Sequence, residues 1–257
     1  MISLAARRHP GLAMRPARFL FALLVPLLLL AGCRQQGEWY IFEGVALGSG
    51  YHITLNGDLG PGESALVEAA IQGELASLDN DIQLLQHLLA AGWPIVLGPP
   101  GAQVPDDLLQ LYRARAVDHL ARVLGEFGVE HALVELGGVQ RTLGRAGRHP
   151  WRVRLPRTGL ASAPDAALRL EGAALVTRSA ARRPEADAPG EARVLAVSVV
   201  AQSAEAADHL ARELLASPLE AAMEQPARVV VLTPRGITLH IGAGLEPLLE
   251  RCARRTT

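Results

Sequence analysis

The stretch ALVELGGVQRTLG, residues 132–144, decides the fold. A run rich in apolar residues precedes Gly137-Gly138 and a second strand-like run follows it, which predicts a β-hairpin with a Gly-Gly turn. Glycine adopts the positive φ that such a turn requires. The same freedom lets a backbone approach a ligand closely. The pair is therefore open to two interpretations, a turn alone or a turn that borders a binding site.

Strands and helices alternate on both sides of this hairpin. Before it, two strand-like runs surround Gly48-Ser49-Gly50, and two segments carry apolar residues at helical spacing, the first with Ser64 as its expected cap. Several further hairpins indicate an α/β (α+β) fold, a single domain whose mixed or antiparallel sheet carries helices on its face. The predicted elements are strands within 38–57, helices at 60–91 and 106–128, strands within 150–156, 167–177 and 194–201, a helix at 203–225, a hairpin at 227–242 that turns at Pro234-Arg235-Gly236, and a closing helix at 244–254.

The first 33 residues have the pattern of a bacterial export signal. Four arginines and no acid precede an apolar run that starts at Phe19, that Pro26 interrupts, and that is shorter than the roughly 20 residues of a membrane span. Leu30-Ala31-Gly32-Cys33 matches the bacterial lipobox, in which the cysteine is lipidated and the chain is cut before it. A plain signal peptide or an uncleaved anchor is the alternative.

The lipobox interpretation sets the domain limits and the location. It gives a signal peptide over residues 1–32, a mature domain over residues 33–257, and a membrane anchor through the lipid on Cys33. We expect the mature domain to face the periplasm of the bacterial cell envelope. Arg34, which follows the cysteine in place of an acid, favours the outer membrane over the inner one.

Composition excludes several classes of function. The formal net charge is −1, and no basic stripe indicates nucleic-acid binding. With Cys33 lipidated, Cys252 alone can form neither an intramolecular disulfide nor a zinc site. The sequence has no nucleophile elbow, no P-loop, no HExxH motif and no Rossmann glycine motif. We expect His119 and His209, each next to an aspartate on a predicted helix, to be solvated.

Two features are open to a binding role. Gly48-Ser49-Gly50 could hold an anion through backbone N–H groups, although a strand-to-strand turn explains the same residues. Asp208 could ligate a hard metal ion such as Mg²⁺, since that ion prefers carboxylate oxygen.

Segments along the mature chain, in order, resemble the FAD:protein FMN transferase (ApbE) family. These segments are GVALGSGYHI (44–53), ELASLDNDIQLL (74–85), the stretch 115–144, PWRVRLP (150–156), GAALVTRS (172–179) and VSVVAQSAEAADHLARELL (197–215). Such proteins are often exported bacterial lipoproteins that bind FAD and Mg²⁺ and attach FMN to a Ser or Thr of a partner flavoprotein. The resemblance implies a flavin site at Leu47, Gly48, Ser49, Gly137, Gly138 and Thr177. It also implies a metal ligand at Asp208.

The chain departs from the family pattern at several of its functional positions. Asp107 and Arg113 hold the Asp and Lys positions of the motif D-x-G-G-x-A-K-G, but Leu109 and Gln110 replace its two glycines. The motif H-x-I-D-P-x-T-G is missing. Arg212 replaces the Thr that follows the metal-binding Asp by four residues. Arginine has no lone pair to give a metal, so we expect Arg212 to pair with Asp208 in the place of the cation.

These departures leave three hypotheses. The first is a working transferase. The second is a weakened or inactive relative that binds FAD or a flavoprotein without transferring FMN. The third is an envelope lipoprotein of another class on a similar fold.

Overall fold

The computed structural model describes residues 37–91, 104–156, 166–180, 192–217 and 219–250. The chain divides into two units, residues 1–36 and residues 37–257, and all described residues belong to the second. The predicted lipobox at Cys33 therefore lies outside the described residues, as does Cys252. No helix among the described residues is long and apolar enough to cross a membrane.

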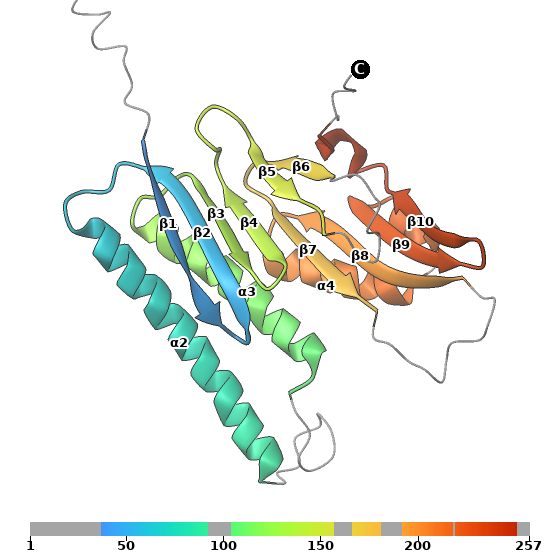
Figure 1. Cartoon of the computed structure of the whole chain (residues 1–257), viewed down its shortest axis with the longest axis horizontal. Coiled ribbons are helices and arrows are strands. Elements are labelled where there is room, and N and C mark those ends of the chain that lie inside the picture. The colour runs from blue at the N-terminus through green and yellow to red at the C-terminus, as the bar shows by residue number, and fades with distance from the viewer. Residues whose placement is uncertain (1–36, 92–103, 157–165, 181–191, 218, 251–257) are drawn as a thin grey trace, which may run out of the picture. The chain divides into compact units, whose positions relative to one another are not determined.

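A large antiparallel sheet forms the centre of the domain (Figure 1). Every strand pair in the described residues is antiparallel. Of the two sheet types that the sequence allowed, mixed and antiparallel, the structure has the antiparallel one. The eight strands, in spatial order, are β1 (Glu38–Ala46), β2 (Ser49–Gly57), β3 (Ala132–Leu136), β4 (Val139–Leu143), β7 (Ala174–Ser179), β8 (Arg193–Ala201), β9 (Ala227–Thr233) and β10 (Gly236–Ile241). A separate hairpin consists of β5 (Trp151–Arg154) and β6 (Ala167–Leu170).

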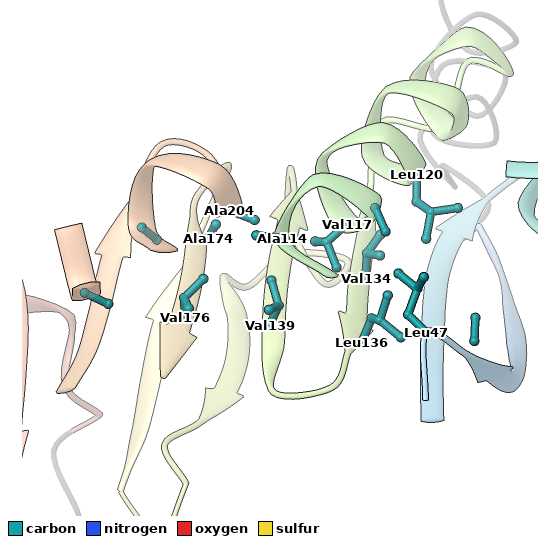
Figure 2. Packing of buried hydrophobic residues seen from close by; sticks show 14 of the residues in the cluster. Leu47, Ala114, Val117, Leu120, Val134, Leu136, Val139, Ala174, Val176 and Ala204 are labelled. Carbon is teal, nitrogen blue, oxygen red and sulfur yellow. The ribbon is translucent and has the colours of Figure 1, made fainter. Parts of the chain in front are cut away.

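Three helices pack along one face of this sheet, α2 (Glu63–Ala90), α3 (Asp106–Glu126) and α4 (Ala204–Ala216). The core lies between them and the strands. Figure 2 shows Val117 and Leu120 of α3 beside Val134 and Leu136 of β3, all of them almost completely buried. The opposite face carries the β5–β6 hairpin, whose buried residues pack with Leu175 of β7 in a second, smaller cluster. The predicted α+β fold with flanking helices is confirmed.

The hairpin predicted from residues 132–144 is confirmed. β3 and β4 pair from Leu136 with Val139 to Ala132 with Leu143. Gly137 has a φ of 56° and Gly138 a φ of 83°. Both values lie in the left-handed region that residues other than glycine rarely adopt, which explains the Gly-Gly pair.

Three local predictions were wrong. The helix predicted at 203–225 ends at Ala216 and a short helix, α5 (Leu219–Met223), follows, because Ser217 is extended ahead of Pro218, a residue that cannot continue a helix. In place of the closing helix, the described residues hold only a 3₁₀ turn, η1 (Glu246–Leu248). The first helix is preceded by Gly62 rather than capped by Ser64.

Candidate functional site

The turn between β1 and β2 lies against the turn between β3 and β4. The backbone N–H of Gly137 donates to the carbonyl of Gly50 at 3.3 Å. Arg113 of α3 lies over both turns, and its Nε and Nη2 donate to the carbonyl of Leu47 at 3.2 and 3.0 Å. The structure therefore brings together the glycines and Ser49 that the sequence assigned to a flavin site, with a guanidinium beside them.

The two glycines of the second turn face different surroundings. A Cβ atom at Gly137 would lie 2.6 Å from Cδ of Arg113 and 3.0 Å from Oγ of Ser49, so Arg113 fills the space above this residue. A Cβ at Gly138 would meet nothing within 4 Å. The open side of the turn is the side of Gly138.

Leu47 takes part in this region through its backbone alone. Its side chain is 1% exposed and belongs to the main core, where Figure 2 shows it near Leu136. Its N–H donates to Oδ1 of Asp79 at 3.2 Å, and its carbonyl is the acceptor for Arg113. The side chain of Leu47 therefore holds the turn on the core.

The carboxylate of Asp208, the predicted metal ligand, is completely buried and bound by two arginines. Arg178 of β7 donates from Nε to Oδ1 at 2.6 Å and from Nη2 to Oδ2 at 2.9 Å. Arg212 donates from Nη2 to Oδ2 at 3.3 Å. The ion pair expected between Arg212 and Asp208 is confirmed, but its distance is longer than either distance between Arg178 and Asp208.

Arg178 also binds Asp107, at the start of α3. Its Nη1 donates to Oδ1 of Asp107 at 2.6 Å and its Nη2 to the backbone carbonyl of the same residue at 3.1 Å. The guanidinium, 4% exposed, thus links two aspartates that lie about a hundred residues apart in sequence. The formal charges of Asp107, Asp208, Arg178 and Arg212 sum to zero.

These residues do not fit a divalent cation. Mg²⁺ needs several oxygen ligands in octahedral geometry, whereas the oxygens of Asp208 already accept from two guanidinium groups. Neither arginine has a lone pair to offer. Within the described ranges, no group of three or more His, Cys, Asp or Glu residues could hold a metal ion. The fixed charge of Arg178 stands between the carboxylates that a metal would require.

The sequence analysis missed Arg178, although a signal for it existed. Alternate residues of a strand point to opposite faces, so position 178 shares the helix-covered face with Ala174 and Val176. Long charged residues are almost never buried unless they are paired. An arginine at an inward position of a buried strand therefore predicts an acidic partner on the covering helices.

Thr177 lies on the other face of β7. Its hydroxyl donates to Oγ of Ser198 on β8 at 2.8 Å, and the same Oγ accepts from Nη2 of Arg228 at 3.0 Å. Thr177 thus belongs to a polar group under the β5–β6 hairpin. Its hydroxyl makes no hydrogen bond with the glycine turns in the described part of the chain.

Asp118 of α3 has a structural role. Its Oδ1 and Oδ2 accept from the backbone N–H groups of Ala204 and Glu205, each at 2.9 Å, at the start of α4. Arg141 of β4 also donates to Oδ1. The aspartate therefore satisfies the free N–H groups of one helix from a neighbouring helix and joins both to the sheet.

The two histidines each face a glutamate. Nδ1 of His119 lies 2.6 Å from Oε1 of Glu74 on α2, and His209, on the exposed side of α4, lies 3.6 Å from Glu213. His209 is exposed, as expected from the sequence, whereas His119 is half-buried against Glu74.

A family model and solved structures match this chain. The model of the ApbE family matches residues 100–229. A flavin transferase ApbE from Vibrio cholerae shares 17% identity at a TM-score of 0.61, over 82% of this chain and 99% of that one. The apo form of the Pseudomonas stutzeri flavinyl transferase ApbE shares 18% identity at a TM-score of 0.61, over 84% and 98%. An ApbE protein from Thermotoga maritima shares 14% identity at a TM-score of 0.57, over 82% and 99%.

At these identities the structural similarity is one of fold. No curated protein sequence matches the chain.

Proposed function

The chain belongs to the ApbE family, and we propose that it is an envelope lipoprotein that binds FAD but has lost Mg²⁺-dependent transfer of FMN to a partner flavoprotein. One observation carries the proposal. The guanidinium of Arg178 occupies the space between Asp107 and Asp208 and donates to both. The anchor at Cys33 and the periplasmic location are part of the same proposal and rest on the lipobox sequence.

Loss of transfer follows from the charge balance of this cluster. Transfer of a phosphoryl group from FAD requires positive charge that neutralises the diphosphate and the developing charge of the reaction. The charge of Arg178 is already compensated by two carboxylates, and its side chain is 4% exposed. Turning it toward a ligand would leave Asp208 buried without its main partner, which is energetically costly.

Flavin binding is supported by the second cation, Arg113. Its Nε and Nη2 share one backbone carbonyl, while its Nη1 donates to no group in the described part of the chain. A planar guanidinium with free donors suits the phosphate groups of a dinucleotide. Ser49 and the open side of Gly138 lie at the same pair of turns. These residues would hold the anionic part of FAD.

The test is a transfer assay combined with a binding assay. Full-length protein in detergent is mixed with FAD, Mg²⁺ and a flavin-acceptor protein, and mass spectrometry measures FMN added to the acceptor. An active flavin transferase with the same acceptor is the positive control. FAD fluorescence measures binding in parallel. We expect saturable quenching of FAD fluorescence and no added FMN.

Each other outcome points to one of the rival hypotheses. Transfer at ordinary enzyme rates that EDTA abolishes would contradict the proposed loss of activity and favour a working transferase. Absence of both transfer and quenching would contradict flavin binding and favour an envelope lipoprotein of another class.

A further inference from the structure

Arg228 of β9 is a buried cation with no carboxylate partner in the part of the chain that the structure describes. Its side chain is 6% exposed and lies on the sheet face that carries the β5–β6 hairpin. Nη2 donates to the carbonyl of Pro156, at the end of that hairpin, at 2.8 Å, and to Oγ of Ser198 at 3.0 Å. It forms no ion pair with a carboxylate of the described residues. Both acceptors are uncharged, so neither of them balances the charge.

The polar side chains of Arg228 and Ser198 have more hydrogen-bond donors than the acceptors around them use. Nε of Arg228 is buried and has no hydrogen-bond partner among the described residues. Ser198 Oγ accepts from both Thr177 and Arg228, which leaves the hydroxyl hydrogen of Ser198 free to donate. The free N–H and O–H groups of these two neighbouring residues require acceptor atoms.

Burial lowers the pKa of Arg228 to about 10. No carboxylate among the described residues opposes this effect, yet the group is still charged at neutral pH. A buried charge without a partner is unfavourable, and an unsatisfied buried donor adds to the cost. A bound anion would remove both penalties at once.

We propose that Arg228 and Ser198 form a binding site for an oxyanion, such as a phosphate group, under the β5–β6 hairpin. The Nε–H of the guanidinium is a buried donor of a charged group that its present hydrogen bonds leave unused, and Ser198 adds a hydroxyl. Thr177 orients Ser198 through its hydrogen bond. The site lies on the opposite face of the sheet from Arg178 and Asp208 and is distinct from the glycine turns at Arg113.

The test compares Arg228→Met with Arg235→Met, an exposed arginine in the turn that follows β9. Thermal unfolding of each full-length protein is measured in sodium phosphate and in sodium chloride at equal ionic strength, and calorimetry measures phosphate binding directly. At phosphate concentrations about a hundred times Kd, we expect the Tm of the wild type and of Arg235→Met to rise by about 5–10 °C. We expect no rise for Arg228→Met, and in chloride a Tm at least equal to that of the wild type.

Ser198→Ala provides a second test that keeps the guanidinium. It should weaken phosphate binding about tenfold, the effect of one hydrogen bond to a charged group. Two results would overturn the proposal: an equal phosphate response in Arg228→Met and wild type, or no phosphate binding to the wild type by calorimetry.

FAD binding by Arg228→Met distinguishes two sources of the anion, a free anion and the diphosphate of the dinucleotide. If Arg228→Met loses phosphate binding and keeps the quenching of FAD fluorescence, the site takes an anion of its own. If it loses both, the anion is part of FAD. Phosphate binding to a wild type that does not bind FAD would support this site while contradicting the proposed flavin binding.

Discussion

Arg178 and Asp208 form a bidentate ion pair in the interior of the domain, with Nε–Oδ1 at 2.6 Å and Nη2–Oδ2 at 2.9 Å. The two side chains are 4% and 0% exposed. The pair joins β7 to α4, and through Asp107 it also holds the start of α3. A single side chain thereby ties together one strand and two helices.

Arg178→Met should destabilise the domain strongly. The change leaves the buried carboxylate of Asp208 with only the longer contact to Arg212, and loss of one partner of a buried ion pair costs about 3–5 kcal/mol. Urea unfolding measures the free energy. Arg122→Met, which breaks the exposed pair with Glu126, is the matched control and should cost less than about 1 kcal/mol. Equal effects would show that the buried pair contributes no more than a surface pair.

Replacement of both arginines should create a metal site. Arg178→Ser with Arg212→Thr removes the two cations and supplies hydroxyl oxygens beside Asp208 and Asp107. We expect the double variant to bind Mn²⁺ or Mg²⁺ in calorimetry and the wild type to bind neither, because carboxylates freed of N–H donors suit these ions. Adding Asp208→Asn should abolish the gain. Magnesium binding to the wild type that Asp208→Ala removes would refute the assigned role of Arg178.

Substitutions at the Gly-Gly turn should differ in cost. Gly137→Ala forces alanine into a left-handed φ and places its Cβ against Arg113, so we expect a loss of about 2 kcal/mol or more. Gly138→Ala has the same backbone strain but meets open space, and should cost about 1 kcal/mol. Urea unfolding compares the two. Arg113→Ala should recover the steric part of the Gly137→Ala effect and none of the Gly138→Ala effect.

Asp118→Ala should loosen the first turn of α4. The N–H groups of Ala204 and Glu205 lose their acceptor, as in the loss of a helix cap, and Arg141 loses its ion pair. We expect a cost of about 2 kcal/mol in urea unfolding and faster hydrogen exchange at these two amides. Asp118→Asn keeps one acceptor oxygen and should show a smaller effect. Unchanged exchange in Asp118→Ala would show that α4 does not depend on this carboxylate.

Much of the architecture could be predicted because it depends on local patterns. Apolar residues at helical spacing fixed α2 and α3 to within a few residues, and Gly137-Gly138 fixed the central hairpin. The errors arose where the backbone preference of a single residue outweighed the spacing of apolar residues. Ser217, which is extended ahead of Pro218, thus divides the helix predicted at 203–225.

The candidate site was harder to predict. Arg212 was correctly paired with Asp208, because residues four apart in a helix are neighbours. Arg178 and Asp107 reach the same carboxylate from a strand and from another helix, so spacing along the chain could not reveal them. The burial of Arg228 was likewise not predicted, because the hairpin predicted at 227–242 did not show which of its residues the neighbouring strands and the β5–β6 hairpin would cover.

The sequence by itself determined the family, the elements and the places where family motifs are missing, because each of these depends on the order of residues along the chain. Only the tertiary structure decided which charges meet. Long-range pairing brought Arg178 between two aspartates and left Arg228 without a carboxylate partner among the described residues, and burial makes both arrangements energetically important.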